Sequence, residues 1–523
     1  MRPLRGGFAL GCLLVALSSV DAVPTGTAQF RNEAAAGPHA AGFRVVNQYD
    51  YSRVFQPQID ELGHPWAGER ARPIQTFIWY PAEKTSKPTM TWGDYVALDG
   101  NQVSFDRPRA IPQAADYFKS LLAPSYGEPT RGTRDAPPSD GHFPAVVYAP
   151  SFTSGAWENV EFCEYLASWG YVVIASPGMG VGYFSTHDLA GVEAQAQDIR
   201  FLVGYAQSLT DIDPGHIAVV GFSWGGLANL FAAAADDRIK ALVDLDGSIR
   251  YWPGLVKAAG IDPSRVRIPL LYFKSQDSLE MQAELESSFS AAAGPSVLNA
   301  WTGGDFYSVE MLRIVHPEFC SIVFRNSDFW KYEFDRLQPA DFTREDGIQS
   351  YAYVEAYTKA FLDFYLKQRP DGLAFLHAAP VQNGVAPHFL GIKTRAGKPR
   401  AFDFADFRVA VATAGFERVA EAYAETRKAH PEFSLSAGDL QKWASDLVSI
   451  GHPSEAIAVA IFALVNETSA GSYNSLGTAY LAARRTDDAI DAFKQALAVK
   501  PDDAVARSAL GHLDVGIGDP GQK

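Results

Sequence analysis

The segment Gly221-Phe-Ser-Trp-Gly-Gly226 holds a serine between glycines, in the pattern G-x-S-x-G. A buried strand is predicted directly before it, at 217–220, and an alanine-rich helix directly after it. In a strand-to-helix turn this tight, small neighbours prevent clashes and the serine hydroxyl stands at the carboxyl edge of a sheet. We therefore expect Ser223 to be a nucleophile that attacks acyl carbonyl groups.

A serine hydroxyl needs a general base, and the base needs a carboxylate to orient it. In this arrangement the acid and then the histidine follow the serine along the chain. His316 follows the apolar run 309–315, where the last core strand is expected, so it is the predicted base. His377 and His388 also lie downstream, but they fall in a segment that is expected to be a linker.

Two aspartates could supply the acid. Asp246 leaves the predicted strand 239–245, whereas Asp277 follows the next predicted strand, 268–273. Most enzymes of this topology take the acid after the penultimate strand, which favours Asp277. From the residues alone, both aspartates remain candidates.

The elements that must position these residues alternate between short apolar strands and helices. This alternation predicts an α/β fold with a mostly parallel central sheet covered by helices on both faces. We place the catalytic domain at 43–370, with an insertion at about 84–142 that is rich in Pro, Gly and Asp. Further strands are predicted at 145–148 and 171–175, and a long aromatic helix at 348–367.

The C-terminal part differs in character. Residues 371–400 are expected to be a linker, and residues 401–523 an all-α domain. Eight residues there fall at tetratricopeptide-repeat spacing: Tyr473, Leu476, Gly477, Tyr480, Ala489, Phe493, Ala496 and Pro501. Such repeats suggest a protein partner or self-association, although small residues at these places also serve simple helix packing.

The N-terminus has the layout of an export signal. Arg2 and Arg5 precede an uncharged apolar run at 8–20, and small residues near Ala22 fit a cleavage site. We expect a signal peptide at 1–22, a flexible leader at 23–42, and a mature chain that is periplasmic or secreted. No transmembrane span is expected in the mature chain, because no other stretch is apolar enough to cross a bilayer.

Composition narrows the function further. The net charge of −15 argues against a nucleic-acid partner, because phosphate binding needs a basic face. Only Cys163 and Cys320 remain beyond the predicted signal peptide, which is neither a disulfide framework nor a metal cluster. We expect two buried thiols, although they could pair in an oxidising compartment, and we expect no metal or cofactor.

Several segments together resemble a known family: Tyr148–Phe152, Gly221–Gly226, Leu245–Gly247 and Val315–Phe319. They look like the platelet-activating-factor acetylhydrolase group, in the dienelactone-hydrolase-like branch of the α/β-hydrolase superfamily. The resemblance covers roughly residues 70–367 and implies the α/β-hydrolase fold. In that group the acid closes an apolar-Leu-Asp segment at a similar distance after the serine, so it favours Asp246 over Asp277. The group's Val-His-x-x-Phe setting is reproduced by His316 and Phe319.

The same resemblance implies an oxyanion hole. Its first donor is the backbone N–H after the serine, which here belongs to Trp224. Its second donor comes from the loop after an earlier strand, where Phe152 is the matching residue. That loop usually reads His-Gly-x-Gly, but residues 150–155 read Pro-Ser-Phe-Thr-Ser-Gly and lack the His-Gly pair. Because this pair is missing, neither the second donor nor the substrate class follows from the loop sequence.

Ester hydrolysis through an acyl-enzyme is the leading hypothesis, with a small-molecule, lipid or sugar ester as substrate. Trp157, Tyr183 and Phe184 lie on loops near the strand ends, where they could line an apolar pocket or belong to the core. The same triad could instead cleave peptides or transfer acyl groups. A third hypothesis is an inactive hydrolase unit that serves as a scaffold for the helical repeats.

Overall fold

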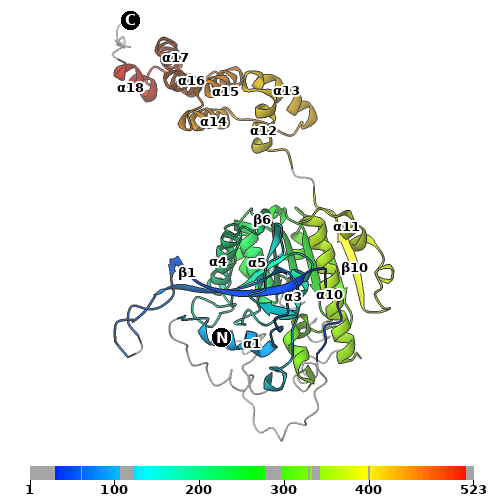
Figure 1. Cartoon of the computed structure of the whole chain (residues 1–523). Coiled ribbons are helices and arrows are strands. Elements are labelled where there is room, and N and C mark those ends of the chain that lie inside the picture. Colours follow the sequence, from blue (N-terminus) through cyan, green and yellow to red (C-terminus); the bar gives the residue numbers. More distant parts are fainter. Residues whose placement is uncertain are drawn as a thin grey trace, which may run out of the picture. The chain divides into compact units, whose positions relative to one another are not determined.

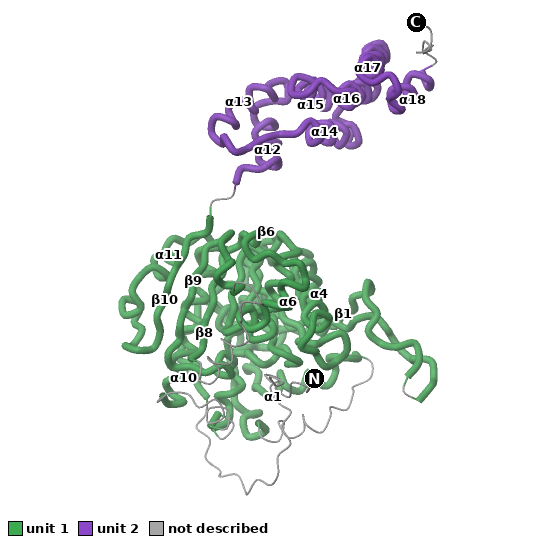
Figure 2. The backbone as a smooth tube through the Cα atoms, turned by 180° about the vertical axis from the view of Figure 1, so that it is seen from behind, with its two compact units in different colours: residues 1–398 green, residues 399–523 purple. Residues whose placement is uncertain are grey.

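The computed structural model divides the chain into two compact units, residues 1–398 and 399–523 (Figure 1, Figure 2). Each unit has a hydrophobic core of its own. The predicted signal peptide lies outside the described residues. The structure describes residues 30–60, 62–105, 122–276, 296–327, 330–331, 342–398 and 401–513.

The first unit is built on a sheet of ten strands in the order β10-β9-β8-β7-β6-β4-β5-β2-β1-β3. The six neighbouring strands from β9 to β5 run parallel, whereas β10 and β2 pair antiparallel at the two ends of this block. The strands are β1 Ala40–Val54, β2 Ala71–Ala82, β3 Gly132–Arg134, β4 Phe143–Ala149, β5 Val172–Ala175, β6 Ile212–Phe222, β7 Ile239–Leu245, β8 Leu270–Lys274, β9 Phe306–Met311 and β10 Leu390–Arg395.

The central strands are apolar on both faces because helices cover both sides. In β4, Val146 and Tyr148 join the core under α3 and α10, whereas Ala145 and Val147 join the core under α4 and α5. This period of two is the ordinary alternation of a strand. The predicted α/β fold with a mostly parallel, doubly covered sheet is therefore confirmed.

The helices of this unit follow the strands along the chain (Figure 1). The α-helices are α1 Trp92–Val96, α3 Val160–Ser168, α4 Leu189–Ala206, α5 Trp224–Ala235, α6 Pro253–Ala258, α8 Val297–Ala300, α10 Arg344–Tyr365 and α11 Pro370–His377. The 3₁₀ turns are η1 Ala97–Asn101, η2 Ala123–Ser125, η3 Pro263–Arg265, η4 His316–Phe319, η5 Ser321–Arg325 and η6 Pro380–Asn383.

The segment expected to be a linker, 371–400, is ordered over most of its described length. It forms most of α11 and then β10, which pairs antiparallel with β9. The pairing satisfies the backbone groups of β9 that would otherwise face solvent at the sheet edge. A strand was hard to predict there because the residues of β10 are mostly exposed and only Leu390 is buried. The expectation of a linker was wrong for residues 371–395, which belong to the first unit.

The expectation of a flexible leader also needs correction. Of the predicted flexible leader, 23–42, the described part packs on the body: Phe30 is buried and its ring stacks on Phe324 at 5.6 Å. The predicted insertion at about 84–142 supplies Trp92 and Tyr95 to the main core. The leader looked flexible because a single aromatic anchor leaves no periodic pattern in a sequence.

The second unit is all helical within its described residues. The helices α14 and α15 pack together, as do α16 and α17, and Gly477 lies so close to the Phe493 ring that a Cβ there would overlap it. The elements are α12 Phe404–Ala414, η7 Phe416–Arg418, α13 Val419–Ala429, α14 Ala437–Ser449, α15 Pro453–Asn466, α16 Ala470–Ala482, α17 Thr486–Val499 and α18 Ala504–His512.

The described part of the chain shows neither a membrane-spanning helix nor a metal cluster. None of the helices found there has the length and apolar character needed to cross a bilayer. Nor do three or more His, Cys, Asp or Glu side chains in the described ranges gather as metal ligands would. Cys163 and Cys320 are both buried thiols.

Candidate active site

Ser223 occupies the sharp turn between the end of β6 and the start of α5. Its backbone has φ 53° and ψ −119°, a strained conformation for a residue with a side chain that costs on the order of 1–3 kcal/mol. A Cβ at Gly221 would overlap Asn229 and the backbone of Gly225, and one at Gly225 would overlap the carbonyl of Ala149. The turn therefore needs the glycines that the motif supplies.

Backbone hydrogen bonds hold this turn against the neighbouring strand. The Ser223 N–H donates to the carbonyl oxygen of Leu245 at 3.2 Å. The Ser223 carbonyl accepts from the N–H of Ser248 at 2.8 Å and from the N–H of Gly226 at 3.1 Å. Since Asp246 lies between Leu245 and Ser248, these bonds fix the serine and the aspartate relative to each other.

Ser223, His316 and Asp246 lie side by side at the carboxyl edge of the sheet. The Nε2 atom of His316 is 3.0 Å from the Ser223 hydroxyl oxygen, and its Nδ1 atom is 2.6 Å from Oδ2 of Asp246. All three residues are buried, with exposed fractions of 4% for the serine, 6% for the histidine and 0% for the aspartate. The histidine thus bridges the hydroxyl and the carboxylate.

Asp246 is held in its ionised form. Burial acts to raise its pKa, but the hydrogen bond and charge of His316, together with Arg250 and Ser275, outweigh burial and leave the pKa below its ordinary value. The Ser275 N–H donates to Oδ1 at 3.1 Å, so both carboxylate oxygens are occupied. The backbone of Asp246 has φ 44°, which turns the side chain out of the strand line.

His316 does not follow its strand directly. β9 ends at Met311, and the histidine opens the 3₁₀ turn η4 after a short connection. Glu318 secures this turn, because its carboxyl group accepts from the N–H of Val315 at 2.8 Å and from the indole N–H of Trp330. Burial raises the pKa of Glu318 to about 8, against the lowering effect of these two donors and of Arg344.

The other predicted residues have the following positions. Trp224 is the first residue of α5, so its N–H has no carbonyl partner within the helix. Phe152 lies in the loop after β4, and its ring meets the Trp224 ring edge-on at 5.7 Å. Asp277 lies outside the described residues. His377 ends α11 with its ring against Tyr307, and His388 precedes β10.

Sequence reasoning missed an aromatic stack around the ring of Trp224, the residue after Ser223. The His187 ring lies between Phe152, at 4.0 Å and 18°, and Trp252, at 5.6 Å and 12°. The buried Trp224 ring meets all three edge-on. Burial lowers the pKa of His187, although Asp188 opposes this, which favours the neutral ring. A search for histidines only after the serine could not find it.

The three aromatic residues expected near a pocket behave differently from one another. Trp157 points into the body, where its indole N–H donates to Asp99 at 3.1 Å and its ring meets Trp92. Tyr183 and Phe184 pack against each other at 4.8 Å, and Phe184 is 53% exposed. Of the three, Phe184 is exposed, whereas Trp157 and Tyr183 are half-buried.

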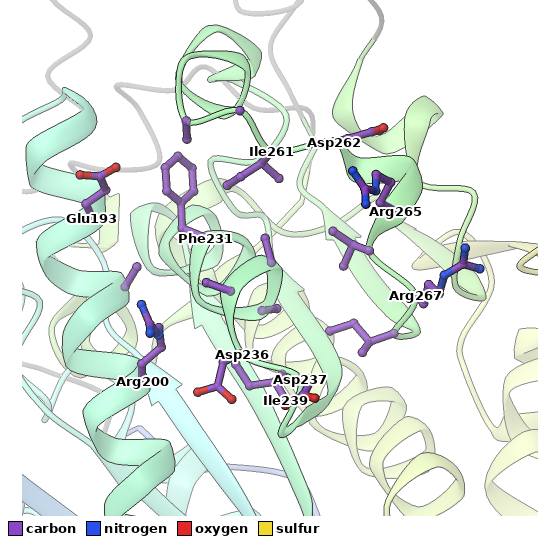
Figure 3. A pocket seen from close by; sticks show the side chains of 18 of the residues that line it. Glu193, Arg200, Phe231, Asp236, Asp237, Ile239, Ile261, Asp262, Arg265 and Arg267 are labelled. Carbon is purple, nitrogen blue, oxygen red and sulfur yellow. The ribbon is translucent and has the colours of Figure 1, made fainter. Parts of the chain in front are cut away.

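A hollow of about 1030 Å³ lies elsewhere, at the amino ends of β7 and β8 (Figure 3). Its walls come from α4, the end of α5 and the segment 259–268, and none of the three triad residues lines it. Basic and acidic side chains mix around it: Arg200, Lys240, Arg265 and Arg267 with Glu193, Asp236, Asp237 and Asp262. Such a mixture selects no class of charged ligand.

No model of a known protein family matches the chain. Two curated proteins of Bacillus subtilis (strain 168) are similar to part of it. YtaP, provisionally named a hydrolase, is 30% identical over 149 residues, which cover 24% of this chain and 50% of YtaP. YitV, provisionally named an esterase, is 31% identical over 117 residues, 21% of this chain and 46% of YitV. The chain thus spans about half the length of the curated relatives it matches.

Among solved structures, a ferulic acid esterase from Streptomyces cinnamoneus has a similar fold. The TM-score is 0.50 at 19% identity, and the match covers 69% of this chain and 98% of that one. At this identity the likeness concerns the fold alone. It shows that the two chains share a fold, while the names hydrolase and esterase belong to the two Bacillus subtilis proteins.

Proposed function

We propose that this protein hydrolyses carboxylic esters through a Ser223–His316–Asp246 triad and an acyl-enzyme intermediate. The observation that carries the proposal is the unbroken chain of contacts from the Asp246 carboxylate through the imidazole to the Ser223 hydroxyl. The names of the similar hydrolase and esterase are consistent with it.

In this mechanism, His316 removes the proton from Ser223 as the hydroxyl oxygen attacks the acyl carbonyl. Asp246, kept ionised by its neighbours, holds the imidazole in the required tautomer and stabilises its charge. The alcohol leaves with the proton from His316. Water then cleaves the acyl-enzyme with the same histidine as base, and no metal or cofactor is required.

The backbone N–H groups of Trp224 and Phe152 are the proposed oxyanion hole. Each such donor contributes about 10²–10³ in rate when it is aimed at the developing negative charge. The position of Trp224 at the start of a helix supports its role, because the first N–H groups of a helix have no internal partner.

The proposed substrates are small-molecule, lipid or sugar esters. The partly exposed stack of Phe152, His187 and Trp252 packs on the ring of Trp224, the residue after Ser223, and supports a substrate with an apolar part. We keep the platelet-activating-factor acetylhydrolase branch as the proposed relationship within the superfamily, on the four segments that resemble it. Export by the N-terminal signal also remains a proposal.

Active-site labelling tests the nucleophile directly. A fluorophosphonate probe reacts with an activated serine, and mass spectrometry of the digested protein locates the adduct. We expect the adduct on Ser223 in the wild-type protein and none in Ser223→Ala. An adduct on another serine, or no adduct together with no turnover of p-nitrophenyl esters, would contradict the proposal.

For the second unit we propose a tetratricopeptide-like module that mediates self-association or binds a protein. The paired helices α14–α15 and α16–α17 support it, and so do the exposed apolar side chains Ile461 and Val465 on α15. Light scattering of the full chain and of a chain ending at Lys398 tests the first alternative. An oligomer that becomes monomeric on truncation supports self-association, and two monomers exclude it.

A further inference from the structure

The loop after β4, residues 150–155, must aim the proposed second oxyanion donor without the His-Gly pair that is usual there. Thr153 instead adopts a left-handed conformation with φ 56°, which is unfavourable for a β-branched residue. A loop in this conformation keeps it only when its surroundings impose it. Contacts from the interior and from neighbouring segments supply that constraint.

Glu158 lies under this loop with its carboxyl group turned back toward it. Oε1 accepts from the N–H of Ser151 at 2.8 Å and from the Tyr148 hydroxyl at 2.9 Å, and Oε2 accepts from the Ser151 hydroxyl at 2.7 Å. Burial raises the pKa of Glu158, while hydrogen bonds from Ser151, Ser154 and Tyr148 oppose this. The side chain is 2% exposed, so water does not compete for these bonds.

Two neighbouring segments, around Gly178 and in α4, complete the support. The N–H of Thr153 donates to the Gly178 carbonyl at 3.1 Å, and the N–H of Gly178 donates to the Ser154 carbonyl at 2.8 Å. The Gln195 amide donates to the Pro150 carbonyl at 2.8 Å. These contacts bind residues on both sides of Phe152, whereas Glu158 binds the residue directly before it, from the interior.

On the basis of the proposed esterase function, we propose that Glu158 is a positioning residue that fixes Ser151 and so aims the Phe152 N–H at the oxyanion. It does not touch the substrate. It takes over the task that small, flexible residues perform in the usual His-Gly-x-Gly loop, by clamping a loop that has larger residues. A misplacement of about 1 Å at a reacting centre can lower the rate about 10²-fold, so the clamp bears on kcat.

The chain offers a matched control in Glu164, which lies six residues further on, in α3. Glu164 is also fully buried, and it accepts from a tyrosine hydroxyl, that of Tyr95 at 2.7 Å, and from two backbone N–H groups, those of Arg131 and Gly132 at 2.8 Å. Its partners belong to the insertion and to β3, not to the oxyanion loop. The two glutamates thus share their chemistry and differ in what they hold.

The test measures kcat and KM for p-nitrophenyl acetate, and the melting temperature, in the full chain. The variants are Glu158→Ala, Glu158→Gln, Glu164→Ala and Glu164→Gln, with wild type and Ser223→Ala in parallel. We expect Glu158→Ala to lower kcat at least about tenfold with KM within about threefold. Glu158→Gln, which keeps one acceptor, should recover part of the loss. Both Glu164 variants should lose melting temperature but keep kcat within about threefold.

Inhibition by a boronic acid, which forms a tetrahedral adduct on an activated serine, gives a second readout. Its affinity should fall in Glu158→Ala by about the same factor as kcat, and should not fall in Glu164→Ala. Equal loss of kcat in the two alanine variants, or full kcat in Glu158→Ala, would overturn the clamp while leaving the esterase proposal intact. A wild-type protein without turnover of any ester would overturn both.

If Glu158→Ala does not fold, Ser151→Ala replaces it. This variant removes the hydroxyl that donates to Oε2 but keeps the backbone N–H bond to Oε1. We expect a smaller fall in kcat, at unchanged KM. Unchanged kcat in both Ser151→Ala and Glu158→Gln would overturn the clamp as well.

Discussion

The parallel strands of the central sheet end at its carboxyl edge and begin at its amino edge, and these two edges have very different surroundings. At the carboxyl edge, strained residues at the ends of β6 and β7 bring Ser223, Asp246 and His316 into contact. At the amino edge lies a hollow of about 1030 Å³ with a mixed set of charged side chains. This hollow lies on the side without the hydrogen-bonded triad.

This difference teaches that the presence of a hollow is by itself a poor guide to the site in this fold. Parallel strands end together at one edge, and the loops that follow them converge there, so polar groups from distant parts of the chain can meet. The backbone strain at Ser223 and Asp246 lies at the same edge and supports that interpretation. Substitutions at each edge test whether the two differ in function as they differ in structure.

The largest effect is expected from Ser223→Ala. Removal of the hydroxyl leaves the proposed oxyanion donors in place but removes the proposed nucleophile, so kcat/KM for p-nitrophenyl esters should fall by at least about 10⁴. The steady-state rate, with circular dichroism to verify folding, measures it. A folded variant with a rate close to that of wild type would move the chemistry away from the carboxyl edge.

A second large effect is expected from Asp246→Asn. The amide cannot hold the imidazole in the productive tautomer, and a loss on the order of 10⁴ in kcat is usual for this change. The paired variant Asp277→Asn should keep its rate within about threefold. If only Asp277→Asn loses its rate, the acid follows β8 rather than β7, and the contact between Asp246 and His316 is structural.

The carboxyl edge was easier to predict from the sequence than the rest of the fold. Ser223 and His316 could be predicted because the strand-to-helix motif and the order of the triad are local signals. The acid was harder, since Asp246 and Asp277 both follow strands, and the choice rested on a resemblance. The contact of Asp246 with His316 supports that choice, while Asp277 lies outside the described residues.

What could not be predicted depends on contacts between distant segments. The strand β10 exists because β9 offers an open edge, and the pattern of its own residues is mostly polar. His187 enters the stack beside Trp224 through a loop after β5 that precedes the serine in the chain. Glu158 looks like an ordinary residue before a helix until its bonds to Ser151 and Tyr148 are seen. None of these leaves a period or a motif.

The buried acids at the two edges should also differ in how their contribution to stability depends on pH. Burial raises the pKa of Glu318, beside His316, to about 8. Between about pH 5 and 8 this carboxyl group is therefore protonated in the folded protein and ionised in the unfolded chain. Its contribution to stability is therefore present in acid and is lost as the pH rises toward 8. The free energy of unfolding of Glu318→Gln, minus that of wild type, should therefore increase from pH 5 to pH 8. Urea unfolding at both pH values measures this difference.

Asp236 at the amino edge provides the contrast. Burial acts to raise its pKa, but hydrogen bonds and charge from Arg238 outweigh this and leave the pKa below its ordinary value. Its contribution is present above the unfolded pKa and is lost only as the pH falls below it. The difference in the free energy of unfolding between Asp236→Asn and wild type should therefore be the same at pH 5 and pH 8. A pH-independent effect of Glu318→Gln would contradict the raised pKa.

The smallest effect is expected from the hollow itself. Arg200 and Arg265 line it and are exposed, so their replacement by alanine removes charge without opening the core. Exposed substitutions change free energies by about 0.5 kcal/mol or less, which corresponds to about twofold in a rate. We expect Arg200→Ala and Arg265→Ala to leave kcat/KM within that range. A tenfold fall of kcat/KM in either variant, with the melting temperature unchanged, would mean that the amino edge is coupled to catalysis, although Ser223 lies at the opposite ends of the strands.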